Sequence, residues 1–251
     1  MNLMNDLSDL TAVILAGGLG TRLRSVIPDR PKVLAPVHGR PFLKYLLDQL
    51  AAVRILRVVL CTGYLGGQVR DELGDHYGSL RLFYSQEPDP LGTAGALRLA
   101  LAQLRSDPVL VMNGDSYCEV DLRAFWNWHV AHGAQATLLL IQQDRTQRFG
   151  RVQIGEDGLV ETFREKDDGS GPGWISGGIY LIRPHLLRAI PEGKEVSLEK
   201  EIFPSWIGQG LYGYCGQGRF LDIGMPESYA ATTQFFAEGA KRRDASIDGS
   251  C

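Results

Sequence analysis

The stretch TAVILAGGLGTRL, residues 11–23, decides how this sequence folds. Its first six residues, Thr11–Ala16, are mostly apolar or β-branched and stop at two glycines, a pattern typical of a buried strand. Gly17, Gly18 and Gly20 then let the backbone turn so that several N–H groups point toward one place, a common way of binding phosphate oxygens. Arg22 adds a cation directly after these glycines. The stretch therefore predicts a strand followed by a phosphate-binding loop.

Two familiar phosphate loops do not fit this stretch. Leu23 stands where the dinucleotide fingerprint G-x-G-x-x-G requires its last glycine, and the P-loop pattern G-x-x-x-x-G-K-[ST] is absent from the sequence. A plain tight turn is the alternative interpretation of the glycines. Arg22 and Lys32, which follows Pro31, favour a polyphosphate ligand, because two fixed cations around such a loop suit its charge.

Outward from this stretch, β-rich apolar runs alternate with segments of helical periodicity. This alternation indicates an α/β fold with βαβ crossovers, and hence a Rossmann-like, mostly parallel sheet with helices on both faces. The expected strands are Leu56–Thr62, Leu80–Ser85, Pro108–Met112 and Ala136–Gln142. The expected helices are Phe42–Leu50, Gly67–Leu73, Thr93–Leu104 and Asp121–His132. Ligands of such sheets bind at the carboxyl ends of the strands.

After residue 150 the pattern becomes richer in strands. The expected elements are a hairpin of Arg151–Ile154 and Leu159–Arg164, strands at Ile175–Ile182, Leu211–Gly216 and Arg219–Ile223, and helices at Ser197–Trp206 and Pro226–Ala237. These elements predict a smaller β-rich part over residues 151–237 beside a ligand-binding part over residues 11–150. We expect both parts to belong to a single domain over residues 1–240, followed by a polar tail at residues 241–251.

Two acidic residues follow apolar runs. Asp115 ends Asn113-Gly114-Asp115, directly after the expected strand Pro108–Met112, and Asp222 stands in the run FLDIG. Each motif alone is more often a turn than a site. Two such carboxylates beside a loop with Gly, Arg and Lys suit Mg²⁺, which binds one or two carboxylates together with substrate phosphates.

Composition excludes several classes of function. The 251 residues carry 26 Lys+Arg and 29 Asp+Glu, a formal charge of −3, which argues against nucleic acid or an anionic membrane as the main partner. No run approaches the roughly 18 apolar residues that a membrane span needs. The amino-terminal segment has two Asp and no Lys or Arg, unlike a signal peptide, and the four cysteines form no CxxC pair. We expect a cytoplasmic protein, and a homo-oligomer is left open.

Six motifs in order resemble those of the sugar-phosphate nucleotidyltransferases over residues 11–237. They are LAGGLGTRL (residues 15–23), PKVLAP (31–36), PLGTAGA (90–96), NGD (113–115), EK (165–166) and LDIGMP (221–226). The run GGLGTRLRSV followed by GRPFLKYLLD is most similar to the heptose 1-phosphate guanylyltransferases of this family. Most hexose enzymes of the family instead read RLxPLT at the position of Arg24, Ser25 and Val26.

The resemblance implies a role for each matching residue. Nucleotide would be bound by Leu15, Ala16, Gly17, Gly18, Gly20, Thr21, Arg22, Lys32, Glu87, Gly92, Thr93 and Asp115, with Gly92 and Thr93 against the base. Sugar phosphate would be bound by Asn113, Glu165, Lys166, Ser176, Gly177 and Glu199. Arg22, Lys32, Asp115 and Asp222 would serve catalysis, and the two aspartates would hold Mg²⁺. One departure concerns the sugar: the family often has N-A-G-x-Y where this chain has Ser176-Gly177-Gly178-Ile179-Tyr180.

The implied reaction joins a sugar 1-phosphate to a nucleoside triphosphate. A sugar-phosphate oxygen attacks the α-phosphorus and pyrophosphate leaves; because a phosphate monoester is already largely dianionic at neutral pH, no protein base is required. GTP and D-glycero-α-D-manno-heptose 1-phosphate are favoured, and the product would feed a surface glycan (lipopolysaccharide, capsule or S-layer). The alternatives are another sugar (mannose, glucose or N-acetylmuramate), another nucleotide, or a catalytically silent regulatory domain that binds sugar nucleotides.

Glu87 is the candidate residue for selecting the base of the nucleoside triphosphate. It directly precedes Pro88 and the segment PLGTAGA, which is expected to line the base pocket. Guanine presents adjacent N1–H and N2–H₂ donors that a carboxylate accepts together, whereas adenine, with an unprotonated N1, cannot satisfy it. The alternative for Glu87 is a solvent-exposed loop acid.

Overall fold

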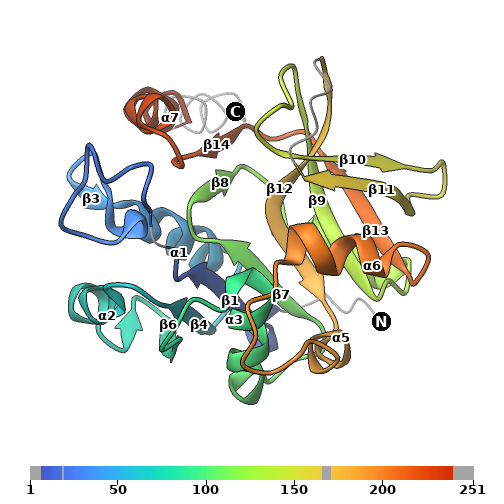
Figure 1. Cartoon of the computed structure of the whole chain (residues 1–251), viewed down its shortest axis with the longest axis horizontal. Coiled ribbons are helices and arrows are strands. Elements are labelled where there is room, and N and C mark those ends of the chain that lie inside the picture. Colours follow the sequence, from blue (N-terminus) through green and yellow to red (C-terminus); the bar gives the residue numbers. More distant parts are fainter. Residues whose placement is uncertain (1–6, 19, 166–170, 240–251) are drawn as a thin grey trace, which may run out of the picture.

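The computed structural model describes residues 7–18, 20–165 and 171–239. Its central feature is a ten-stranded sheet (Figure 1). Four parallel strands lie side by side in the order β6-β4-β1-β7. Their bounds are Thr11–Ala16 for β1, Arg57–Thr62 for β4, Leu80–Gln86 for β6 and Val109–Asn113 for β7. The predicted α/β fold with a mostly parallel central sheet is confirmed.

The second half of the chain continues the same sheet with mainly antiparallel strands. Strand β12 (Gly173–Ile182) runs antiparallel to β7 and to β9 (Ala136–Gln143). The predicted hairpin is present as β10 (Gly150–Ile154) and β11 (Val160–Glu165), and it adds to the first half of β12. Strand β13 (Leu211–Gly216) pairs in parallel with β9, and β5 (His76–Tyr77) pairs with β6.

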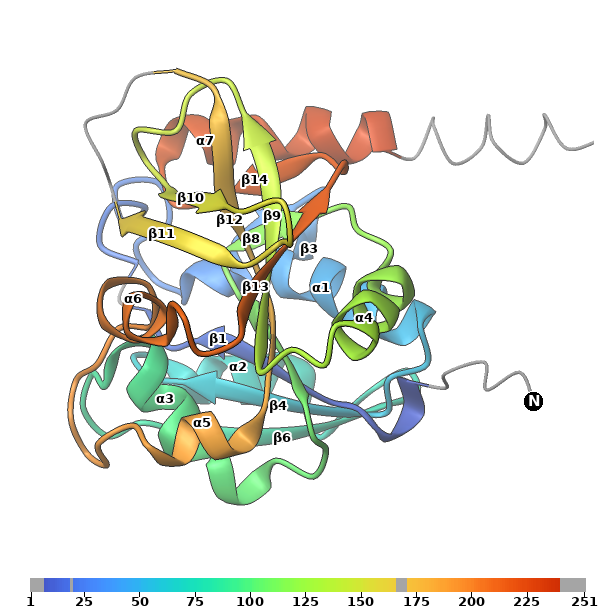
Figure 2. The same cartoon turned by 90° about the vertical axis from the view of Figure 1, so that its right-hand side faces the viewer.

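Helices cover both faces because successive side chains of a strand point to opposite sides. Ala12 and Ile14 of β1 belong to the core that includes Leu43 and Leu46 of the first helix, whereas Val13 belongs to the core with Leu97. The helices are α1 (Phe42–Ala52), α2 (Gly66–Leu73), α3 (Gly92–Ala100), α4 (Leu122–Ala131), α5 (Pro184–Arg188), α6 (Phe203–Trp206) and α7 (Pro226–Ala230). Figure 2 shows α4 and α6 on opposite sides of the sheet.

Short elements shape the ends of the strands. They are η1 (Leu7–Asp9), η2 (Lys32–Leu34), β2 (Pro36–Val37), β3 (Arg40–Pro41), η3 (Leu101–Gln103), β8 (Ser116–Cys118), η4 (Leu198–Ile202) and β14 (Phe220–Asp222). Strand β14 pairs antiparallel with β8, which sets Asp222 opposite Ser116. This small sheet brings two acids, Asp115 and Asp222, together although they are far apart in the sequence.

Three predicted helices are wrong in extent. The expected helix Thr93–Leu104 ends at Ala100 and continues as the 3-10 turn η3. Ser197 does cap the next helix, since its Oγ accepts from the N–H of Lys200, but the helix begins as the π-helical η4 before α6.

The expected helix Pro226–Ala237 is also divided. Helix α7 stops at Ala230, and residues 232–239 form a second helical segment. The hydroxyl of the buried Thr232 donates to the carbonyl of Tyr229 at 2.7 Å. A Thr side chain can thus occupy an acceptor that a continuous helix would use.

In the described part of the chain, the helices are too short or too polar for any of them to cross a membrane.

We expect His129 to make the stability of the fold sensitive to acid. Its side chain is buried, its Nδ1 lies 2.7 Å from the Thr137 hydroxyl, and its Nε2 has no hydrogen-bond partner among the described residues. Burial, and then the charge of Arg183, lower the pKa of His129 from 6.5 to about 4. Protonation of His129 therefore favours the unfolded chain. The contribution of this group to stability is fully present above pH 6.5 and is lost as the pH drops toward 4. We expect the free energy of unfolding to lose about 2 kcal/mol between pH 7.5 and pH 5 through this group.

The measurement is urea unfolding at the two pH values. His129→Gln should lose less stability than the wild type over this range, because glutamine does not titrate. His132→Gln, at an exposed histidine of the same helical region, is the matched control. An equal pH dependence in the wild type and His129→Gln would contradict the prediction.

Candidate functional site

Three adjoining cavities lie at the carboxyl ends of the parallel strands. The Glu87 cavity, about 510 Å³, is lined by Gly17, Gly63, Tyr64, Gln86, Glu87, Pro88, Asp89 and Pro90. The central cavity, about 430 Å³, shares Gly17, Glu87 and Pro90 with the first and extends to Lys32, Asp115 and Glu165. The Asp222 cavity, about 190 Å³, shares Arg22, Lys32, Asn113, Asp115, Glu165 and Glu199 with the central one. Two ligands bound in neighbouring cavities would therefore meet over the same side chains.

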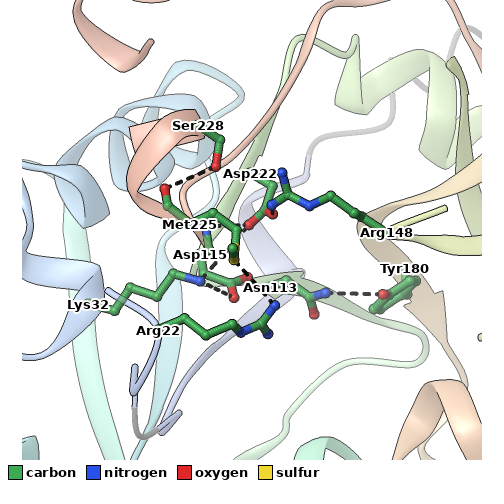
Figure 3. A network of polar contacts seen from close by, with 10 residues as sticks. Arg22, Lys32, Asn113, Asp115, Arg148, Tyr180, Asp222, Met225 and Ser228 are labelled. Atoms are coloured by element: carbon green, nitrogen blue, oxygen red, sulfur yellow. Dashed lines mark hydrogen bonds and ion pairs between the residues drawn. The ribbon is translucent and has the colours of Figure 1, made fainter. Parts of the chain in front are cut away.

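Lys32 is held between two acids at this meeting point (Figure 3). Its Nζ lies 2.8 Å from Oδ2 of Asp115 and 3.9 Å from Oδ1 of Asp222. The lysine side chain is only 12% exposed, so its charge is poorly screened by solvent. It comes from η2, Asp115 follows β7, and Asp222 ends β14. The cation and both carboxylates are thus supplied by three different elements.

Asp222 sits in a crowded electrostatic environment. Burial, and then the negative charge of Asp115, raise the pKa of Asp222, while Lys32, the N–H of Gly224 and Arg148 act in the opposite direction. The Gly224 N–H donates to Oδ1 at 2.7 Å. The two carboxylates are therefore close enough to repel each other and are stabilised by surrounding cations.

These two acids fit a divalent cation. Both approach one ammonium group, which shows that they face the same small space. In the described part of the chain, no group of three or more His, Cys, Asp or Glu side chains could hold a metal ion. A cation bound here would thus need further ligands from a phosphorylated substrate, the combination that Mg²⁺ commonly uses.

Glu87 is packed against glycine backbone. A Cβ added to Gly17 would lie 2.5 Å from its Oε1, and one added to Gly63 would lie 2.6 Å from it, so this carboxylate packs closely against both glycines. Its Oε2 accepts from the N–H of Leu91 at 3.1 Å. Burial raises the pKa of Glu87, and the Leu91 hydrogen bond acts in the opposite direction. Glu87 is therefore a fixed acceptor on a cavity wall rather than a freely solvated loop acid.

Glu199 joins the central cavity to the Asp222 cavity. Its Oε2 accepts from the hydroxyls of Thr93, at 2.8 Å, and Ser197, at 3.1 Å. The Thr93 hydroxyl in turn accepts from the N–H of Leu198. Burial raises the pKa of Glu199, and the negative charge of Glu165 raises it further. The hydrogen bonds from the Thr93 and Ser197 hydroxyls lower it. Thr93 is thus engaged with Glu199 and lines the central cavity together with Gly92 and Glu87.

Asn113 has an unfilled hydrogen-bonding position. Its Nδ2 donates to the Tyr180 hydroxyl at 3.3 Å, and Ser176 donates to the same hydroxyl at 3.2 Å. The buried Oδ1 of Asn113 has no partner among the described residues. Asn113 lines both the central and the Asp222 cavities, although its Oδ1 is itself buried.

Most of the predicted site residues meet in these cavities. Those lining the central cavity are Leu15, Ala16, Gly17, Gly18, Arg22, Lys32, Glu87, Gly92, Thr93, Asn113, Asp115, Glu165 and Glu199. Ser176 and Asp222 line the Asp222 cavity.

Three predicted residues do not line these three cavities, and a fourth lies outside the described part of the chain. Gly20 packs against Cβ of Lys32, and Thr21 is exposed in the following turn. The α-carbon of Gly177 faces Leu139 and Ile141, and its neighbour Gly178 lines the Asp222 cavity instead. Lys166 lies outside the described residues.

Sequence reasoning missed several residues that the fold brings in. Arg148 and Tyr180 line the Asp222 cavity, Tyr64 lines the Glu87 cavity, and Glu195 lines the central one. Tyr180 belongs to the segment Ser176–Tyr180 that aligns with the family motif N-A-G-x-Y, so the motif was a signal for its place in the site. Arg148 and Glu195 stand in polar loops and have no local pattern that distinguishes them from surface residues.

A Rossmann-like sheet with a polar crevice over its carboxyl edge defines an α/β ligand-binding protein of the nucleotide-binding type. A family model described as nucleotidyl transferase matches residues 11–239. The chain belongs to this family of sugar-phosphate nucleotidyltransferases.

Two named relatives are guanylyltransferases. The chain is 36% identical over 222 residues to the mannose-1-phosphate guanylyltransferase of Mycobacterium tuberculosis, which covers 87% of this chain and 62% of that protein. It is 35% identical over 221 residues to the D-glycero-α-D-manno-heptose 1-phosphate guanylyltransferase of Aneurinibacillus thermoaerophilus, covering 88% of this chain and 95% of that protein. The chain therefore spans less than two thirds of the first relative and nearly all of the second.

The fold is shared with a solved relative. The crystal structure of HddC from Yersinia pseudotuberculosis complexed with GMP-PN matches with a TM-score of 0.80 at 30% identity. The match covers 90% of this chain and 99% of that chain.

Proposed function

We propose that this chain transfers a guanylyl group from GTP to a sugar 1-phosphate, with D-glycero-α-D-manno-heptose 1-phosphate as the favoured acceptor. The observation that carries the proposal is the pair of adjoining cavities that share Arg22, Lys32 and Asp115. GTP would occupy the Glu87 and central cavities, and the sugar phosphate would occupy the Asp222 cavity. The reacting phosphates would then meet beside Lys32.

The named relatives support guanine more directly than they support one sugar. Both the mannose and the heptose enzymes are guanylyltransferases, and their identities to this chain, 36% and 35%, do not separate them. The heptose preference rests on the opening motif GGLGTRLRSV. Mannose 1-phosphate is accordingly the first alternative acceptor.

The site chemistry suits transfer between two anions. A dianionic sugar phosphate is already a nucleophile, so the protein must align it and balance the charge of both substrates. Arg22 and Lys32 supply positive charge at the shared wall of the cavities. Asp115 and Asp222 would hold Mg²⁺, which when bound supplies further charge compensation at the phosphates.

The direct test is pyrophosphate release by the purified protein. GTP, ATP, CTP and UTP should each be combined with heptose, mannose, glucose and N-acetylmuramate 1-phosphates. We expect the highest kcat/KM for GTP with the heptose substrate. No release with any pair would refute the transferase proposal, and a higher kcat/KM with mannose 1-phosphate would reassign the acceptor.

Lys32→Met and Arg22→Ala should lower kcat as well as raise the KM for GTP. Negative charge moves onto the departing pyrophosphate, so cations at this place act more strongly on the transition state than on bound GTP. We expect kcat to fall about tenfold or more in each variant. Lys44→Met is the matched control, because Lys44 forms an ion pair of 2.6 Å with Glu72 away from the cavities. A raised KM with unchanged kcat would limit both residues to binding.

A further inference from the structure

Arg148 is a charged residue of the Asp222 cavity with no role in the proposed reaction so far. Its Nη2 lies 3.6 Å from Oδ2 of Asp222, and its side chain is 47% exposed (Figure 3). It lines the Asp222 cavity but not the central cavity. Its guanidinium therefore reaches the side of the site assigned to the sugar phosphate and not the side assigned to GTP.

Packing holds the Arg148 backbone in place. Thr146 is buried, and its carbonyl accepts from the N–H of Phe149 at 3.0 Å, which closes a tight turn around Arg148. The Phe149 ring packs edge-on against Phe220, with centroids 5.4 Å apart. Phe220 precedes Asp222 by two residues in β14. The same strand thus positions the acid and, through an aromatic contact, the loop that carries Arg148.

Within the described part of the chain, one cationic side chain lines the Asp222 cavity, assigned to the sugar phosphate, without also lining the central cavity, assigned to GTP. Among the described residues, the Asp222 cavity is lined by three cations, Arg22, Lys32 and Arg148, and the first two also line the central cavity. Lys32 has its shortest contact with Asp115. Within residues 7–18, 20–165 and 171–239, a phosphorylated ligand in the Asp222 cavity would find Arg148 as the cation that GTP does not share.

We propose that Arg148 binds the phosphate of the sugar 1-phosphate, and that Asp222 holds its guanidinium ready in the ligand-free protein. This inference rests on the proposed function. A half-exposed ion pair contributes little to stability, so its exchange is not opposed by a strong contact. When the ligands bind, the contact between Asp222 and Arg148 is lost. Asp222 then contacts the divalent cation, and Arg148 contacts the substrate phosphate. The planar guanidinium can donate two parallel hydrogen bonds to phosphate oxygens, which an ammonium cannot do.

Steady-state kinetics of Arg148→Gln test the binding role. With heptose 1-phosphate and with mannose 1-phosphate as probes, the KM for the sugar phosphate should rise about tenfold or more, and the KM for GTP should stay within about twofold. Arg148→Lys should give an intermediate value, because it keeps the charge and loses the forked geometry. Arg145→Gln removes the same charge from an exposed position three residues earlier and should change neither KM.

Manganese binding without substrates tests the exchange independently of turnover. Followed by electron paramagnetic resonance, Arg148→Gln should bind Mn²⁺ about threefold more tightly or better, because Asp222 loses a competing cation. Arg145→Gln should bind it as the wild type does.

Each contrary result would refute a different part of the proposal. An unchanged sugar-phosphate KM in an active Arg148→Gln enzyme would overturn the proposal and leave Arg148 as a counter-charge of Asp222. An equal rise in the KM for GTP would assign Arg148 to the nucleotide and overturn it as well. Unchanged Mn²⁺ affinity would refute the exchange. A wild type that releases no pyrophosphate with any sugar 1-phosphate would instead refute the proposed function, and with it the ligand assigned to Arg148.

Discussion

Asp115→Asn and Asp222→Asn should each lower kcat at least about a hundredfold while the fold stays intact, because loss of one carboxylate from a two-carboxylate cation site removes several kcal/mol of charge stabilisation. Asparagine keeps the size of the side chain, and at position 222 its oxygen can still accept from the N–H of Gly224. The expected loss is therefore one of charge and not of packing.

Circular dichroism and the thermal midpoint should accordingly match the wild type, and Mn²⁺ affinity should fall together with kcat. Asp48→Asn is the matched control, since Asp48 pairs with Arg40 at 2.8 Å on the surface and lies outside the three cavities. A near-normal kcat at saturating Mg²⁺ in either variant would remove that aspartate from the cation site.

Glu87→Gln should abolish most of a preference for GTP over ATP that we expect to reach about a hundredfold in the wild type. A buried acceptor left unpaired by the wrong base costs a few kcal/mol, which corresponds to discrimination of this size. Glutamine is chosen because its oxygen can keep the Leu91 N–H bond that shapes the loop. Its amide N–H₂ would then face the N–H donors of guanine.

The measurement is kcat/KM for the four nucleotides in the wild type and the variant. Asp89→Asn changes the same charge at an exposed position of the same cavity and should leave the preference unaltered. Equal use of ATP by the wild type would refute the guanine assignment. An unchanged preference in Glu87→Gln would show that Glu87 only braces the loop.

Local sequence determined the elements that carry most of the site. The strand Thr11–Ala16, its glycine loop and the Asn113-Gly114-Asp115 strand end are all where the pattern predicted them. These signals are strong because strand periodicity and glycine turns depend on residues adjacent in the chain. The ordered motifs then identified the family, and the positions in them converge on connected cavities.

Tertiary structure alone decided which distant groups touch. Pairing of β14 with β8 brings Asp222 to Asp115 and Lys32, and the Thr93 hydroxyl meets Glu199 across 106 residues of chain. Arg148 lies beside Asp222 in a loop whose neighbouring Phe149 packs on Phe220 of β14. At the divided carboxyl-terminal helix, Thr232 is likewise buried and its hydroxyl donates to the carbonyl of Tyr229. Such contacts join residues with no relation along the sequence, and their energy comes from burial and charge pairing that exist only once the sheet has formed.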